Sequence, residues 1–422
     1  MDQKLYKWFG KQKKTNIIKV KTIDISKIKN WTINQDRIFH NSKRFFKIIG
    51  IKVKTNFYKK NWDQPIILQK EVGILGILKN NKNDKYLLQT KVEPGNKNKI
   101  QFSPTVQATK SNYSQVHGGK KVPYLKYFKN LNKNFLHKQS EQGFRYFNKF
   151  NSNILINIKS KIRLKYGFIW VSLPELCRMA NKKNLLNMDT LSVISSNISH
   201  NITDNPLHKI SSIKEWIKNK DKTYFLKTLI VPLTKLKDWN YNSKAIVHKN
   251  KKHFSIIGVE IQTNKREVDE WCQPILKGKN LAISGFLVKK FDHTNHYLCR
   301  YILKPGLKKS VLSCTVNSSD LKNYKKDKNL TLFQKKVISN YILNNDLKKN
   351  RLYDNIMSDE GGRFFHCQIR YVGFLLNKST RITLPTNYIW VSQNQMIKLI
   401  KEKKVDIEAR LLFGSININK LK

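Results

Sequence analysis

Short apolar runs separated by polar turns make up most of this chain, a pattern typical of β-strands. The runs are rich in Ile, Val, Phe and Tyr and are bounded by Gly, Pro, Asn and Asp. They include residues 46–53, 66–79, 86–92, 153–158 and 254–262. We therefore expect most of the chain to form sheet.

Helices are expected at two matching places, over residues 172–179 and from 393 to 403. Ser172 and Ser392 precede them and are suitable N-caps, because a serine hydroxyl can accept a hydrogen bond from a free amide of the first turn. A mixed sheet with few helices per unit predicts the α+β class.

The sequence contains an internal duplication with a period close to half its length. The paired segments keep their order, and the spacing between partners leaves room only for small loop insertions. The clearest pairs are 46–50 with 254–258, 62–66 with 271–275, 140–146 with 358–364, and 169–172 with 389–392. The chain therefore holds two copies of one domain.

This duplication predicts four segments along the chain. Residues 1–44 form an N-terminal basic segment, and residues 45–198 form the first repeat. Residues 199–250, with an expected helix around 213–216, connect it to the second repeat at 251–422. The Asn, Lys and Asp content of the connecting segment indicates a linker.

The composition fits two buried cores in a reducing compartment. With 422 residues and 40% hydrophobic content, the chain can fill two ordinary cores. No apolar run approaches the length of a membrane span, and the N-terminus lacks a secretory signal. The five cysteines are odd in number and show no Cys-x-x-Cys spacing, which argues against a disulfide scaffold or a thiolate metal site. We expect a cytoplasmic protein without a membrane partner.

The net charge of +54 permits two interpretations. Clusters of Lys and Arg ordinarily indicate nucleic acid, because they release counterions from phosphate. Here the positive residues are spread along the chain, and the excess is lysine, accompanied by asparagine and isoleucine. We interpret this as codon bias on a solvated surface and expect no specific nucleic-acid partner. A basic RNA-associated protein is the alternative function.

The segment 93–119 carries the most chemical information. It is rich in Asn, Gln, Ser, Thr, Tyr, His and Glu, and it follows the predicted strand at 86–92. Such neutral hydrogen-bonding groups suit a polar organic ligand. The chain has no phosphate loop of standard spacing and no Gly-x-Ser-x-Gly elbow, and His293 and His296 lack a suitably spaced carboxylate. What remains is a set of residues for acid–base chemistry without a cofactor.

Short polar motifs that contain glycine and proline occur in both halves. Those of the first half are 93–96, 103–109, 111–113, 116–119, 139–143 and 187–190. Those of the second half are 266–268, 271, 273–274, 358–364 and 370–371. Together they resemble the NDP-hexose 2,3-dehydratases of deoxysugar biosynthesis, over roughly residues 45 to 413.

The resemblance implies a duplicated Nudix-like fold, a homodimer and a lyase. Neither half contains the acidic metal box of Nudix hydrolases. The implied substrate is a dTDP-4-keto-6-deoxyhexose, which loses water across C2 and C3 to give a 3,4-diketo-2,6-dideoxy sugar. The 4-keto group acidifies the C3 proton, so the reaction needs a base, an acid and hydrogen-bond donors for the C4 oxygen, but no redox cofactor or metal.

Three residues are catalytic candidates. Glu141 is the expected base, with a salt bridge to Arg145 as the alternative interpretation. His117 has the side chain best suited to proton transfer near neutrality, unless it only bonds backbone in a turn. Tyr113 could donate a proton, stack on thymine or simply anchor its loop.

A larger set of polar residues is expected to bind the substrate. Arg145 and Arg363 are candidate diphosphate clamps, since guanidinium groups match phosphate oxygens. Thr105 and Gln107 alternate along a short predicted strand and should point the same way. Glu93 could orient a sugar hydroxyl or only cap its turn. The full set is Glu93, Asn96, Ser103, Thr105, Gln107, Ser111, Asn112, Gly118, Gly119, Ser140, Arg145, Ser358, Glu360, Gly361, Arg363 and Tyr371.

The two halves differ where the resemblance places ligands. Lys304 stands where the first half has Glu93, which reverses the charge. Residues 358–364 keep the family pattern, whereas Phe144 replaces a small residue in the first half. We expect the more complete sugar-nucleotide pocket in the first repeat. The second repeat would be architectural or bind nucleotide without turnover, and a vestigial binder without activity is a further alternative.

Overall fold

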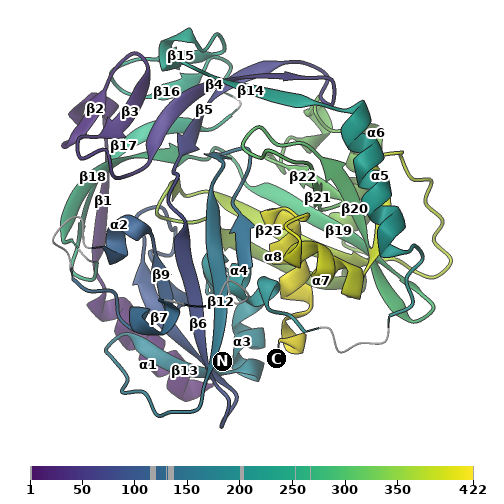
Figure 1. The fold of residues 1–422 in the computed structure, drawn as a ribbon, viewed down its shortest axis with the longest axis horizontal. Helices are drawn as coiled ribbons and strands as arrows, with labels where there is room; N and C mark the ends of the chain where they lie inside the picture. Colours follow the sequence, from purple (N-terminus) through teal and green to yellow (C-terminus); the bar gives the residue numbers. More distant parts are fainter. Residues whose placement is uncertain are drawn as a thin grey trace.

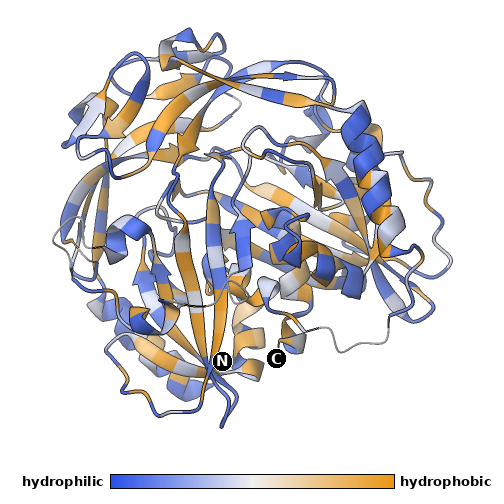
Figure 2. Cartoon of the chain, in the orientation of Figure 1, coloured by the Kyte–Doolittle hydropathy of each residue, from blue (hydrophilic) through white to orange (hydrophobic). Residues whose placement is uncertain are grey.

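The computed structural model describes residues 2–114, 120–129, 131, 137–199, 204–251, 253–266 and 268–421. Within these ranges the chain forms four β-sheets flanked by short helices (Figure 1). The predicted α+β class is confirmed. Hydrophobic residues are concentrated along the strands, whereas helix α5 (Ile210–Thr223) is mostly hydrophilic (Figure 2).

The first repeat contains a smaller and a larger sheet. Along the smaller sheet lie, in order, β11 (Tyr146–Phe147), β5 (Trp62–Leu68), β4 (Lys47–Thr55), β3 (Arg37–His40) and β2 (Trp31–Ile33). Along the larger sheet lie β10 (His137–Ser140), β12 (Phe150–Ile158), β6 (Gly73–Asn80), β7 (Lys85–Val92) and β13 (Phe168–Ser172), with β8 (Ile100–Pro104) on β7 and β9 (Val106–Ala108) on β6.

The second repeat has the same two sheets. The smaller one contains β15 (Trp239–Tyr241), β16 (Ile246–His248), β17 (Ser255–Thr263), β18 (Glu270–Lys277) and β24 (Phe364–Phe365). The larger one contains β21 (Val311–Ser313), β20 (Thr294–Ile302), β19 (Ala282–Phe291), β25 (Gln368–Leu375) and β23 (Arg351–Ser358), with β22 (Val316–Ser318) on β19 and β26 (Tyr388–Ser392) on β20.

Helices lie at corresponding places in the two repeats. The α-helices are α1 (Gln3–Thr15), α2 (Lys110–Tyr113), α3 (Leu173–Ala180), α4 (Met188–Ser196), α5, α6 (Leu332–Val337), α7 (Gln393–Lys401) and α8 (Ile407–Ile416). Shorter helical turns are η1 (Ile25–Lys27), η2 (Leu125–Phe128), η4 (Leu233–Lys235), η5 (Tyr324–Lys326), η6 (Ile338–Ile342), η7 (Lys348–Asn350) and η8 (Ile418–Lys420).

The two helices expected from the sequence are confirmed as α3 and α7. Ser172 caps α3 by accepting a hydrogen bond from the Glu175 amide. Ser392 caps α7, where Gln395 completes a capping box. Over the part of the chain that the structure describes, no helix is long and apolar enough to cross a membrane.

Each repeat contributes one strand to the smaller sheet of the other repeat. The N-terminal strand β1 (Ile18–Ile23) pairs antiparallel with β17 of the second repeat. The connecting strand β14 (Leu226–Val231) pairs antiparallel with β4 of the first repeat. Segments 1–44 and 199–250 thus carry corresponding helices and strands. We infer that the repeating unit begins at α1 and at α5 rather than after these segments.

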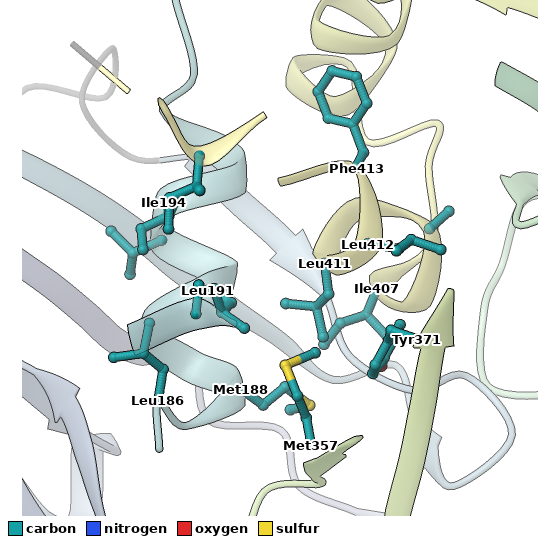
Figure 3. Packing of buried hydrophobic residues seen from close by; sticks show 14 of the residues in the cluster. Leu186, Met188, Leu191, Ile194, Met357, Tyr371, Ile407, Leu411, Leu412 and Phe413 are labelled. Carbon is teal, nitrogen blue, oxygen red and sulfur yellow. The ribbon is translucent and has the colours of Figure 1, made fainter. Parts of the chain in front are cut away.

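One hydrophobic core joins the two repeats. Helices α4 and α8 pack against each other at its centre, and Figure 3 shows Leu191 on α4 facing Leu411 on α8. Arg410 of α8 is fully buried there and donates to Ser192 Oγ at 2.6 Å and to the Ser140 carbonyl oxygen at 3.0 Å. The repeats therefore form a single folded body.

Two pairs of turns cross between the repeats. The Gly95 amide donates to the Gly361 carbonyl at 2.7 Å, and the Gly306 amide donates to the Gly143 carbonyl at 2.7 Å. A Cβ at Gly306 would lie 1.7 Å from the carbonyl oxygen of Tyr146. Because the two backbones approach so closely, only glycine fits at this crossing.

Replacing Gly306 by alanine should destabilise the protein, because the crossing backbones must separate to admit the Cβ atom. We expect the free energy of unfolding, measured by chemical denaturation, to fall by about 1–3 kcal/mol. Gly10→Ala is the matched control, since a Cβ there meets no atom within 4 Å and alanine favours a helix. Equal stability of the two variants would contradict the crossing.

Candidate active site

A cavity of about 440 Å³ lies between the repeats. The first repeat contributes residues from its strands and from the turn at 140–146, and the second contributes β18 and the turn at 358–364. A volume of this size is typical of pockets that enclose a small organic ligand. The cavity is therefore a site that neither repeat forms alone.

Five acidic side chains line this cavity, namely Asp189, three acids that act electrostatically on it, and Glu270 of β18. Glu93 follows β7, Glu141 follows β10, Asp189 lies in the first turn of α4, and Glu360 lies in the turn at 358–364. Glu93, Glu141 and Asp189 are 3%, 5% and 3% exposed. Burial raises the pKa of all three carboxyls, and repulsion from their acidic neighbours adds to the shift.

Glu93 is held by a chain of hydrogen bonds. Its Oε1 accepts from Gln107 Nε2 at 2.9 Å, and its Oε2 accepts from the Gly361 amide at 3.0 Å. Gln107 Oε1 in turn accepts from Ser103 Oγ at 2.5 Å and from Asn187 Nδ2 at 2.9 Å. Glu93 and Gln107 are thus fixed in orientation at the cavity wall.

Glu141 lies in a mixed environment of burial and positive charge. Burial raises its pKa to about 6, although Arg410 and Lys149 act in the opposite direction. Asn151 Nδ2 donates to Glu141 Oε1 at 2.7 Å. Burial also lowers the pKa of Lys149 to about 8. A carboxylate whose pKa lies close to neutrality is suited to general-base catalysis.

Two neighbouring residues at the crossing of the turns, Arg145 and Tyr146, contact different residues of the second repeat. The Tyr146 hydroxyl donates to Glu360 Oε2 at 2.6 Å and so connects the two repeats beside the cavity. Its neighbour Arg145 forms an ion pair with Asp359 and lies 5.1 Å from the centre of the Phe364 ring. Arg145 therefore packs against residues of the second repeat, and it does not line the cavity.

Aromatic side chains from the segment between β2 and the start of β4 also line the cavity. The ring centres of Trp31 and Phe46 are 4.9 Å apart, and those of His40 and Phe45 are 4.6 Å apart. The guanidinium of Arg363 lies 4.1 Å from the centre of the Phe46 ring. This arrangement offers flat apolar surfaces next to a cation.

Arg363 retains hydrogen-bonding capacity that the protein does not use. One terminal nitrogen donates to the Gly362 carbonyl at 2.9 Å. Its Nε is buried and has no hydrogen-bond partner among the described residues. A guanidinium with unused donors beside a cavity is a ready site for a phosphate group.

The corresponding acids of the second repeat are neutralised. Lys304, the counterpart of Glu93, is 3% exposed, and its Nζ lies 2.8 Å from Asp406 and 2.6 Å from Glu408. Arg145 pairs with Asp359, the counterpart of Glu141. Acidic neighbours raise the pKa of Lys304, which keeps it charged. Acidic side chains that lie among other acids in the first repeat thus correspond to acids with an ion-pair partner in the second repeat.

A second hollow of about 490 Å³ lies between α5 and residues 384–388 and is more open. Lys220 is the one charged residue among the described residues that line it. Because it gathers no set of titratable groups, the cavity between the repeats is the better candidate for catalysis.

Six of the residues predicted from the sequence line the cavity. They are Glu93, Gln107, Asn112, Glu141, Glu360 and Arg363. Gly361 and Ser103 lie behind them and bond to Glu93 and Gln107. His117, Gly118 and Gly119 lie outside the described residues. The structure thus brings the predicted acids and one predicted arginine together at the cavity, but not the whole predicted set of residues.

The remaining predicted residues that the structure describes are placed elsewhere and do not line the cavity. Tyr113 packs against the hydrophobic cluster around Phe128. Ser111 Oγ donates to Glu71 Oε2 at 3.0 Å, and Ser358 Oγ donates to Asn184 Oδ1 at 3.1 Å. The others outside the lining are Asn96, Ser140, Arg145 and Tyr371, the last of which is buried in the core shared by the repeats (Figure 3).

Thr105 and Gln107 do not project together. The Thr105 hydroxyl bonds inside the larger sheet, donating to the Leu87 carbonyl and accepting from the Leu78 amide at 3.0 Å. Gln107 lines the cavity. Thr105 sits at the bend between β8 and β9, so the alternation of a continuous strand does not extend through it.

Several cavity residues were missed by the sequence analysis. Asp189 lies in the motif 187–190 that carried part of the resemblance, so its position could have been found. Lys149 and Asn151 follow the recognised turn at 140–146. The aromatic residues from Trp31 to Phe46 carried no recognisable motif. Others lie on the second-repeat side, namely Arg266, Val268, Glu270, Trp271, Cys272 and Gln273.

Buried acids held in different environments within one cavity are typical of an enzyme that moves protons. A sequence profile of NDP-hexose 2,3-dehydratases matches residues 2–196 and 210–416, which are the two repeats. The chain therefore belongs to the NDP-hexose 2,3-dehydratase family, whose members are sugar-nucleotide hydro-lyases. The class predicted from the motifs is confirmed.

Three known proteins are similar to nearly the whole chain, and each is named dTDP-4-dehydro-6-deoxy-alpha-D-glucopyranose 2,3-dehydratase. The protein from Amycolatopsis orientalis is 30% identical over 97% of this chain and 89% of its own length. The protein from Saccharopolyspora spinosa is 29% identical over 97% and 90%. The protein from Streptomyces violaceoruber is 29% identical over 97% and 95%.

Replacing Lys304 by methionine should strongly destabilise the fold, because Asp406 and Glu408 would be left as buried charges without their partner. We expect a loss of about 3–5 kcal/mol in the free energy of unfolding at neutral pH. The loss should shrink as pH falls, because burial raises the pKa of Glu408 and protonation removes its charge. Lys322→Met, at an exposed position, is the control. A Lys304→Met variant as stable as this control would show that the ion pairs are not needed.

Proposed function

We propose that this chain removes water across C2 and C3 of a dTDP-4-keto-6-deoxyhexose, giving a 3,4-diketo-2,6-dideoxy sugar. The observation that carries the proposal is the combination of groups in one cavity. Buried carboxyls with unequal environments line it, and so do aromatic rings beside Arg363. The names of the three relatives indicate the same substrate class.

The aromatic lining residues and Arg363 suit the nucleotide half of the substrate. Thymine can stack on partly exposed rings such as His40 and Phe45, and the diphosphate can take the unused donor of Arg363. The net charge of +54 would attract such an anion at long range without specifying it. The sugar would then extend towards the buried acids.

We assign distinct roles in the elimination to Glu141 and Lys149, which both line the cavity. The Glu141 carboxylate takes the C3 proton, which the 4-keto group has acidified, and an enolate forms. Lys149 is our candidate donor to the developing C4 oxyanion, because a buried ammonium is most effective where water is excluded. The C2–O bond then breaks, and the enol product becomes the diketo sugar. The overall change is redox-neutral, so the chemistry requires no redox cofactor.

The other catalytic candidates are treated differently. His117 stays a prediction, since it lies outside the described residues. Tyr113 does not line the cavity, and we assign it no catalytic role. We also propose, from the resemblance, that each repeat is Nudix-like, that the protein acts as a homodimer and that it works in the cytoplasm. The second repeat, with its acids paired, is proposed to be architectural.

Proton NMR with dTDP-4-keto-6-deoxyglucose in deuterated water tests the proposal directly. Loss of the C3 signal together with the C2 carbinol signal, leaving diketo product or its breakdown fragments, is the expected result. A folded protein that changes neither signal would contradict the proposed function.

The pH dependence of turnover should report Glu141. Only the ionised carboxylate accepts the C3 proton, so kcat/KM should rise with pH through about 6, and it should fall again above about 8 as Lys149 loses its proton. Glu141→Gln should lose about 10²- to 10⁴-fold in kcat, the usual contribution of a general base. Glu215→Gln on the exposed face of α5 is the control. An unchanged rate in Glu141→Gln would remove this residue from the mechanism.

Arg363 should matter for binding the nucleotide. Arg363→Met is expected to weaken dTDP binding in isothermal titration by at least about tenfold, the range of a lost charge-assisted hydrogen bond. Arg381→Met, at an exposed position, should retain affinity. If the two variants bind equally well, the diphosphate does not lie against Arg363.

A further inference from the structure

Asp189 is a buried acid that the cavity leaves without a partner. It is 3% exposed, lines the cavity, and follows the N-cap Asn187 of α4, whose Oδ1 accepts from the Thr190 amide at 2.9 Å. Within the described ranges no hydrogen bond or ion pair reaches the Asp189 carboxyl. A buried polar group normally has a hydrogen-bond partner in the protein, so this one is available to a ligand.

The second repeat provides an internal comparison. Glu408 occupies the position in α8 that Asp189 occupies in α4, and it bonds to Lys304 at 2.6 Å. In the first repeat the counterpart of Lys304 is Glu93, an acid. At matching positions of the two repeats, Glu408 is therefore neutralised by a lysine, whereas Asp189 lies among other carboxyls.

The surroundings of Asp189 favour its neutral form. Burial, and repulsion from Glu141, Glu360 and Glu93, raise its pKa well above the ordinary range, although Lys91 opposes the shift. The N-terminus of α4 also favours the ionised form. Burial alone can shift a carboxyl pKa by several units, which is more than a helix end contributes. Asp189 is thus expected to carry a proton at neutral pH.

We propose that Asp189 is the general acid that protonates the C2 hydroxyl as it leaves. This assignment rests on the proposed function and names the residue that completes it. Several other proton carriers at the cavity are engaged by the protein. The Tyr146 hydroxyl donates to Glu360, Lys149 Nζ donates to the Glu71 carbonyl at 2.5 Å, and Lys91 Nζ donates to the Gln107 carbonyl at 2.9 Å. Both carboxyl oxygens of Glu93 accept hydrogen bonds. Asp189 has no such partner among the described residues.

The proton balance closes over the whole reaction. Glu141 takes the C3 proton, and the electrons of the resulting enolate form the C2–C3 double bond while the C4 ketone is restored. The C2–O bond breaks, and the Asp189 proton joins the departing oxygen to make water. The C3 enol then returns its hydroxyl proton to Asp189, and Glu141 delivers its proton to C2. Both residues regain their starting states.

Asp189→Asn is the first test, because the amide keeps the shape of the side chain but cannot supply the proton. We expect elimination to fall by about 10²- to 10⁴-fold, the range of a general acid. Deuterium exchange at C3 and binding of dTDP should persist, since the base and the nucleotide site are intact. Asp84→Asn, in an exposed turn, is the matched control.

A change of leaving group separates an acid from a structural residue. The 2-deoxy-2-fluoro analogue of the substrate expels fluoride, which needs far less protonation. Asp189→Asn should eliminate fluoride at a rate close to that of the wild-type protein, and Asp189→Glu, which retains an acid, should recover part of the activity on the natural substrate.

Several results would overturn the assignment. A variant Asp189→Asn with full elimination, or one that loses exchange, binding and fluoride elimination together, would show that Asp189 is not the acid. Lys149→Met showing exchange without elimination, while Asp189→Asn does not, would transfer the role to Lys149. A wild-type protein that neither exchanges the C3 proton nor eliminates would overturn the proposed function and this assignment with it.

Discussion

The reciprocal crossing of turns between the repeats is the constraint on which the rest of the structure depends. The Gly95 amide bonds to the Gly361 carbonyl, and a Cβ at Gly95 would lie 1.8 Å from the carbonyl oxygen of Phe364. This approach brings Glu360 and Arg363 of the second repeat to the cavity, whose remaining lining comes from the first repeat and from residues 266–273 of the second. The exchange of β1 and β14 also joins the two repeats. The active site is thus a product of the duplication and not of either copy.

The two repeats share one fold, and a few side chains determine which of them contributes the buried acidic residues of the cavity. The second-repeat acids that correspond to those of the first are neutralised by Lys304 and by Arg145, which comes from the first repeat. In the first repeat, Glu93 takes the lysine position, so repulsion and burial act together on its neighbours. Placing like charges in a dry site costs stability, and such sites are typical of catalysis.

The sequence predicted the elements whose causes are local. The duplication, the α+β class, the helices capped by Ser172 and Ser392, and the charge reversal at Lys304 all follow from short patterns. The strand exchange does not, because pairing of β1 with β17 is decided by tertiary contacts. Arg145 and Arg363 occupy equivalent motifs, yet one meets Asp359 and the other faces the cavity. Trp31 lies in β2 and Phe46 directly before β4, so the aromatic residues at the cavity do not form one sequence motif.

The central claim is that one cavity, completed by the second repeat, holds the whole sugar nucleotide. The most direct measurement is a crystal structure with an unreactive dTDP-hexose analogue that lacks the C4 ketone. The account predicts thymine on the aromatic rings around Phe46, the diphosphate on Arg363, and C2 and C3 of the sugar against Asp189 and Glu141. A ligand seated elsewhere, or one with no contact to the turn at 358–364, would contradict it.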